Sequence, residues 1–96
     1  ANNTGGLSGP AVKPVAVRMV HEASKAVKIP VIGMGGISNG DDAVEFMLAG
    51  ATAVAVGTAN FINPSACVEV KNGIESYLKM YNYNGVYDIV GKLQLN

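Results

Sequence analysis

Glycines stand at three points of the sequence where a backbone could approach an anion closely. The stretches are GGLSG at residues 5–9, GMGG at residues 33–36 and GT at residues 57–58. Because glycine has no Cβ, its backbone N–H groups can reach a phosphate directly. A single stretch of this kind is more often a tight turn, but the second and third each follow an apolar run directly. Together they indicate a phosphate-binding site.

The elements around these loops are predicted to alternate between helix and strand. Proline favours a first helical position, and Ser or Asn favours a cap. On these signals the sequence predicts a first helix from about Pro14 to residues 28–30, followed by a strand at 30–34. A second helix is capped by Ser38 or Asn39 and ended by Gly50, and a second strand follows at 51–56. A third helix is capped by Asn63, and a helical turn is predicted at 86–90.

This alternation predicts a parallel sheet, in which the carboxyl ends of the strands meet at one edge. The loops at residues 33–36 and 57–58 should therefore lie together. Two strands do not make a stable sheet alone, so other strands are expected to complete it.

Other candidates for chemistry are assigned to structural roles. His21 and Lys13 are expected to face solvent, and Cys67 is expected to be a buried structural thiol on the apolar face of the last helix. Asp41 and Asp42 are placed in the first helical turn, where carboxylates interact favourably with the helix dipole. No cluster of metal ligands, catalytic acid, base or nucleophile is found. Packing and surface positions are expected for Tyr77, Tyr81, Tyr83 and Tyr87.

The composition excludes several classes of protein. The chain has 96 residues, of which 49% are hydrophobic and 15% charged, and its formal net charge is zero. Disorder, nucleic-acid binding and a membrane span do not fit these values, and no secretory signal opens the chain. One cysteine indicates a reducing compartment, the cytoplasm. The low charge and the start without methionine predict a single partial domain over residues 1–96.

Four sequence motifs resemble the dihydroorotate dehydrogenase family. They are TGGLSGPAVKPVA at residues 4–16, IPVIGMGGI at 29–37, DAVEFMLAGA at 42–51 and AVGTA at 55–59. Their order and spacing are specific to that family. The stretches LSGP and GMGG resemble its class 1B, NAD-linked catalytic subunit more than the fumarate-linked form.

The resemblance implies a fold and an activity. The family forms a (β/α)8 TIM barrel, and this chain would be its C-terminal part, with about two βα units and a preceding helix. The enzyme oxidises dihydroorotate to orotate in pyrimidine biosynthesis with FMN bound at the strand ends. In class 1B, electrons pass to a partner subunit that carries FAD and an iron–sulfur cluster, and then to NAD⁺.

The resemblance also implies roles for individual residues. The motifs match FMN-contacting positions at Gly9, Gly35, Gly36, Gly57 and Thr58. The last four would hold the phosphate through backbone amides, and Gly9 would lie near the flavin's phosphate-bearing chain. The family's catalytic cysteine belongs to an upstream loop that is absent here. The segment alone is therefore expected to be inactive.

Partners and alternatives follow from the same reading. The expected partners are the remainder of the barrel, the electron-transfer subunit and further copies in a homo-oligomer. One alternative is another FMN- or phosphate-binding barrel, such as a dihydropyrimidine dehydrogenase-like domain. The other is a non-catalytic fragment that self-associates through its open sheet edges.

Overall fold

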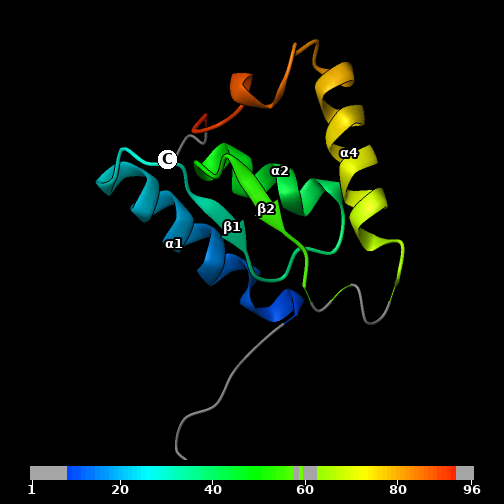
Figure 1. The fold of residues 1–96 in the computed structure, drawn as a ribbon, viewed down its shortest axis with the longest axis horizontal. Helices are drawn as coiled ribbons and strands as arrows, with labels where there is room; N and C mark the ends of the chain where they lie inside the picture. The colour runs from blue at the N-terminus through cyan, green and yellow to red at the C-terminus, as the bar shows by residue number, and fades with distance from the viewer. Residues whose placement is uncertain (1–8, 58, 60–62, 93–96) are drawn as a thin grey trace, which may run out of the picture.

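A computed structural model of the chain describes residues 9–57, 59 and 63–92. In this part of the chain, helices pack against one face of a two-stranded sheet (Figure 1). In chain order the elements are η1 (Pro10–Val12), α1 (Lys13–Ala26), β1 (Ile32–Met34), α2 (Gly40–Ala49), β2 (Ala53–Ala55), α4 (Ala66–Met80) and η2 (Val86–Asp88). None of the described helices combines the length and apolarity needed to cross a bilayer.

The two strands pair in parallel, as the sequence predicts. Gly33 lies opposite Val54 and Met34 opposite Ala55, with α2 as the crossover between the strands. The carboxyl ends of β1 and β2 therefore open at one edge, the lower edge in Figure 1, beside the start of α1. The order of strands and helices confirms the predicted α/β fold.

Helix α2 begins and ends where its capping residues predict. The side-chain oxygen of Asn39 accepts a hydrogen bond from the backbone N–H of Asp42 at 2.9 Å. At the other end Gly50 has a φ of 132°, a conformation that strongly favours glycine. Both ends of α2 are thereby set by residues within one helical turn.

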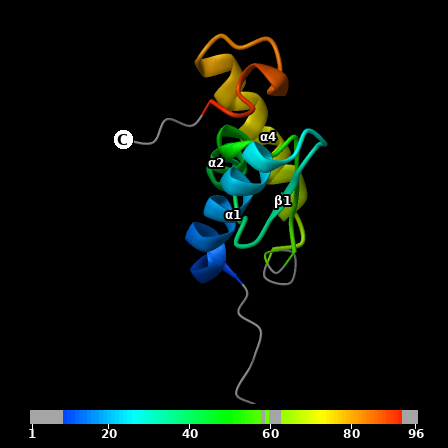
Figure 2. The same ribbon diagram turned by 90° about the vertical axis from the view of Figure 1, so that its left-hand side faces the viewer.

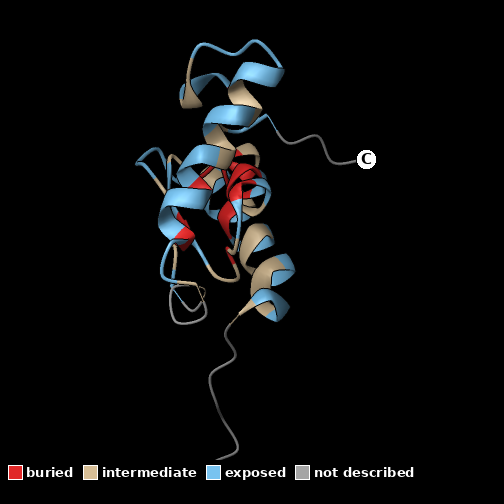
Figure 3. Ribbon diagram, turned by 90° about the vertical axis from the view of Figure 1, so that its right-hand side faces the viewer, coloured by how far each residue is buried: buried red, intermediate tan, exposed pale blue. Residues whose placement is uncertain are grey.

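The core lies between α2 and the sheet and is closed by α1 and α4 (Figures 2 and 3). Phe46 of α2 is fully buried, and a Cβ added to Gly33 would lie 2.7 Å from its ring. On the other face of β1, Ile32 and Met34 are 64% and 65% exposed. A short parallel sheet with one uncovered face is what part of an α/β barrel presents.

Helix α4 begins two residues later than predicted. Asn63 and Pro64 lie in a turn. The side-chain oxygen of Asn63 accepts a hydrogen bond from the backbone N–H of Ser65 at 3.0 Å, and its backbone carbonyl accepts one from the N–H of Ala66 at 3.0 Å. Asn63 also donates to Glu69 at 2.7 Å. The predicted Asn63 cap is therefore wrong, because this side chain stabilises the turn before the helix.

Helices α2 and α4 cross at a pair of glycines. A Cβ added to Gly73 would lie 2.6 Å from the Cα of Gly40, which is backbone and cannot rotate away. Alanine in place of a helical glycine stabilises a helix by about 1 kcal/mol. Gly73→Ala therefore tests whether this gain in helix propensity is smaller than the cost of the clash with Gly40. We expect a net loss of about 1–3 kcal/mol in the free energy of unfolding, measured by urea denaturation.

The matched control for this prediction is the neighbouring exposed residue of the same helix, Asn72. Asn72→Ala should leave the free energy of unfolding unchanged or raise it slightly, because only helix propensity changes. Equal stabilisation by both variants would contradict the close helix contact.

Candidate functional site

The loop after β1 closes on the start of α1 through two glycines. Gly35 and Gly36 have φ angles of 118° and 76°, in the region that L side chains rarely adopt. A Cβ added to Gly36 would lie 2.9 Å from the carbonyl oxygen of Gly9 and 3.0 Å from the backbone nitrogen of Lys13. The structure therefore brings Gly9 and Gly36 into contact.

The loop after β2 opens at the same edge. Gly57 lies two residues after Ala55. Ala55 pairs with Met34, and Met34 immediately precedes Gly35. Apart from the neighbours of Gly57 in the chain, no described residue has an atom within 4 Å of a Cβ built on Gly57, so the space beside it is open to them. Thr58, the fifth predicted site residue, lies outside the described residues.

This edge has the properties of an anion site. Glycines at 35, 36 and 57 leave the backbone uncovered by their own side chains, and α2 begins at Gly40, a few residues beyond the first loop. Backbone N–H groups and a helix N-terminus favour a phosphate. The residues present thus fit a phosphate that is held by the backbone.

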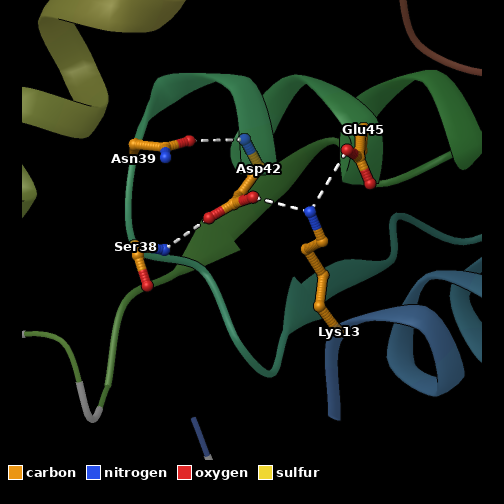
Figure 4. Close-up of polar contacts among 5 residues, drawn as sticks. All are labelled: Lys13, Ser38, Asn39, Asp42 and Glu45. Atoms are coloured by element: carbon orange, nitrogen blue, oxygen red, sulfur yellow. Dashed lines mark hydrogen bonds and ion pairs between the residues drawn. The ribbon is translucent and has the colours of Figure 1, made fainter. Parts of the chain in front are cut away.

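Two carboxylates in the first turn of α2 oppose this preference, and Lys13 compensates one of them (Figure 4). The Lys13 ammonium lies 2.7 Å from Asp42 and 3.2 Å from Glu45. The expectation that Lys13 faces solvent is wrong. The sequence does not predict this pairing, because Lys13 and Asp42 are 29 positions apart and come together only when α1 packs beside α2.

Both partners of this ion pair have shifted pKa values. The hydrogen bond to Asp42 raises the pKa of the Lys13 ammonium, against the lowering effect of burial, and Glu45 raises it further. Burial of Asp42 raises its pKa, but hydrogen bonds from Lys13 and the backbone of Ser38, with the Lys13 charge, outweigh it. The net pKa of Asp42 is lowered, so the pair is ionised at neutral pH.

His21 is not placed as the sequence predicts. It lies in a hollow of about 300 Å³ between α1, the end of α2 and residues 90–91. Its Nε2 atom is buried and has no hydrogen-bond partner among the described residues. The prediction of a solvated side chain is therefore wrong for this nitrogen. Helix α1 packs closely on the end of α2 here, since a Cβ added to Gly50 would lie 2.5 Å from the Cβ of Ser24.

Cys67 is exposed, so its predicted role as a buried thiol is wrong. The buried residues of α4 are Ala66 and Val70, and the helical repeat turns Cys67 away from the face that they share. Cys67 instead lines an apolar hollow of about 380 Å³ between β2 and α4.

The tyrosines pack as predicted. The centroid of the Tyr77 ring lies 4.7 Å from that of the Tyr81 ring and 6.4 Å from that of the Tyr83 ring. Tyr87 is exposed. Burial of Tyr77 raises the pKa of its hydroxyl, and Tyr83 and Tyr81 add to the effect. Within the described ranges there is no group of three or more His, Cys, Asp or Glu that could hold a metal ion.

Comparison with protein families identifies the relatives of this chain. A model of the family described as dihydroorotate dehydrogenase matches residues 1–78. The chain is 62% identical over 93 residues to the dihydroorotate dehydrogenase B (NAD⁺) catalytic subunit of Alkaliphilus oremlandii, and 61% identical over 92 residues to that of Bacillus pumilus. These alignments cover 97% and 96% of this chain but only 31% and 30% of the two relatives.

Solved structures agree with this relationship. The dihydroorotate dehydrogenase of Eimeria tenella in complex with ferulenol matches with a TM-score of 0.86 and 32% identity over 94% of this chain and 25% of that chain. The ligand-free form of that enzyme matches with a TM-score of 0.85 and the same identity. The match confirms the prediction of a partial α/β barrel.

Proposed function

The chain belongs to the dihydroorotate dehydrogenase family, and we propose from this premise that it forms the part of such an enzyme that binds the phosphate of FMN. The longer catalytic chain, of which residues 1–96 would be one part, would oxidise dihydroorotate to orotate in pyrimidine biosynthesis. One observation carries the phosphate role: the pairing of β1 with β2 puts the positive-φ glycines 35 and 36 and the open Gly57 at one edge.

The residues of this chain would hold the cofactor and not the substrate. In this proposal Gly35, Gly36, Gly57 and Thr58 donate backbone N–H groups to the phosphate, and Gly9 packs beside them. When bound, FMN supplies a flavin ring that accepts a hydride. The segment would act on the rate through the position of that ring, because a displacement of about 1 Å can cost about 10²-fold.

The proposed partners follow from the names of the relatives. Two relatives are named catalytic subunits of the B (NAD⁺) form, which supports a separate electron-transfer subunit. That this subunit carries FAD and an iron–sulfur cluster is part of the proposal and rests on the family resemblance alone. The identity of 62% favours this reading over a dihydropyrimidine dehydrogenase-like barrel. Residues 1–96 would need the remainder of the barrel for activity, in a homo-oligomeric cytoplasmic enzyme.

Gly57→Val in the longer catalytic chain tests the phosphate role. Gly57 has no positive φ, and a side chain there would meet none of the described residues outside its chain neighbours, so it should be tolerated but would occupy the proposed phosphate position. We expect FMN to bind at least about tenfold more weakly, with the affinity for riboflavin, which lacks the phosphate, unchanged. Quenching of flavin fluorescence on titration measures both affinities.

The matched control is Gly85→Val, at another glycine with open space and no positive φ, in the turn before η2. It should leave both affinities unchanged. If the unsubstituted protein binds riboflavin as tightly as FMN, the proposed phosphate site is wrong. Anaerobic bleaching of the bound flavin by dihydroorotate tests the proposed reaction separately.

A further inference from the structure

We propose that Lys13 is a positioning residue for the phosphate loop: it braces residues 35–39 against α1 and neutralises the Asp42 carboxylate, which is hydrogen-bonded to that loop. The inference rests on the proposed FMN phosphate site and adds a residue that does not itself touch the phosphate. Its basis is the set of contacts drawn in Figure 4.

Asp42 joins the far end of the loop to Lys13. One of its carboxylate oxygens accepts from the Lys13 ammonium at 2.7 Å, and the other accepts from the backbone N–H of Ser38 at 2.9 Å. Its own N–H is held by the Asn39 side chain at 2.9 Å. The last two residues of the loop are thus tied to the residue that Lys13 holds.

The backbone of Lys13 contacts the near end of the same loop. A Cβ on Gly36 would lie 2.9 Å from the Cβ of Lys13 and 3.0 Å from its backbone nitrogen. Lys13 therefore touches the loop at Gly36 and, through Asp42, at Ser38 and Asn39. A single residue at the start of α1 braces both ends of the segment proposed to hold the phosphate.

The charge of Lys13 acts on the same site. The Asp42 side chain is only 13% exposed, so water screens its charge poorly, and it sits one hydrogen bond from the loop. An uncompensated carboxylate there would repel a phosphate dianion. Glu45 is half-exposed and a more distant contact of Lys13, so its charge matters less.

The ammonium of Lys13 is not free to bind the phosphate itself. It already lies between two carboxylates, 2.7 Å from Asp42 and 3.2 Å from Glu45. Breaking a part-buried, hydrogen-bonded ion pair to bind the phosphate instead would cost free energy, because it leaves the Asp42 carboxylate without its partner. Direct binding and positioning make different predictions. If Lys13 bound the phosphate directly, Lys13→Met should weaken FMN binding as much in an Asp42→Asn background as in the unsubstituted protein. A residue that acts through Asp42 should lose its effect in that background.

The experiment compares variants of the longer catalytic chain by their affinity for FMN and for riboflavin, measured by flavin fluorescence. Lys13→Met should weaken FMN binding by about tenfold and change riboflavin binding by less than about twofold. Lys13→Arg should keep most of the FMN affinity because the charge remains. In an Asp42→Asn background, Lys13→Met should change FMN affinity by less than about twofold, because the carboxylate through which Lys13 acts is gone.

Arg18→Met is the matched control, because Arg18 lies on the same helix and pairs with Glu22 at 3.1 Å in an exposed ion pair. It should leave FMN affinity unchanged. The inference is overturned if Lys13→Met has no effect, if it weakens FMN and riboflavin equally, or if it weakens FMN as much in the Asp42→Asn background as in the unsubstituted protein. Equal affinity of the unsubstituted protein for FMN and riboflavin would instead overturn the phosphate site itself.

Discussion

Gly36→Ala in the longer catalytic chain is expected to weaken FMN binding by about a hundredfold. The φ of 76° at Gly36 is strained for alanine, a cost of about 1–3 kcal/mol. The added Cβ would also meet the carbonyl of Gly9 at 2.9 Å and the nitrogen of Lys13 at 3.0 Å, both of them backbone. Because relief requires the loop and the start of α1 to separate, the strain falls on the proposed phosphate site.

Two measurements check this expectation. Titration with FMN and with riboflavin separates loss of the phosphate contact from loss of the flavin pocket. Gly85→Ala provides the control, since that position has open space and no positive φ. Retention of FMN affinity in Gly36→Ala would show that the loop can relax without moving the site, and would contradict the role assigned to Gly36.

Phe46→Ala is expected to cost about 3–5 kcal/mol in the free energy of unfolding. Phe46 is fully buried, and its ring fills the space beneath Gly33, which has no side chain of its own. Truncation would leave a cavity between α2 and β1 that no neighbour can fill without moving the strand. Urea denaturation should show a lower midpoint with an unchanged m-value.

The effect of Phe46→Ala should come from packing alone. Phe46→Leu keeps most of the apolar volume and is expected to cost less than half as much as the alanine variant. Val68→Ala, at a position of α4 that is 60% exposed, should leave the free energy of unfolding nearly unchanged. Equal losses at Phe46 and Val68 would contradict the placement of the core between α2 and the sheet.

Short-range signals account for the parts of the fold that were predicted correctly. The cap at Asn39 and the stop at Gly50 depend on the residue itself and on neighbours within one helical turn. The same local signals misplaced the start of α4, because Asn63 can stabilise either a cap or a turn. Its hydrogen bonds to Ser65 and Glu69 select the turn.

The amino-acid sequence alone determined the βα order, the parallel pairing and the glycine loops, because apolar runs and glycine's freedom at positive φ are properties of short stretches. The tertiary structure decided which residues surround those loops. Lys13 and Asp42 are 29 positions apart, and only the packing of α1 beside α2 makes them an ion pair. The exposure of Cys67 and the buried ring nitrogen of His21 are likewise set by helix contacts, since burial depends on neighbours that are distant in the sequence.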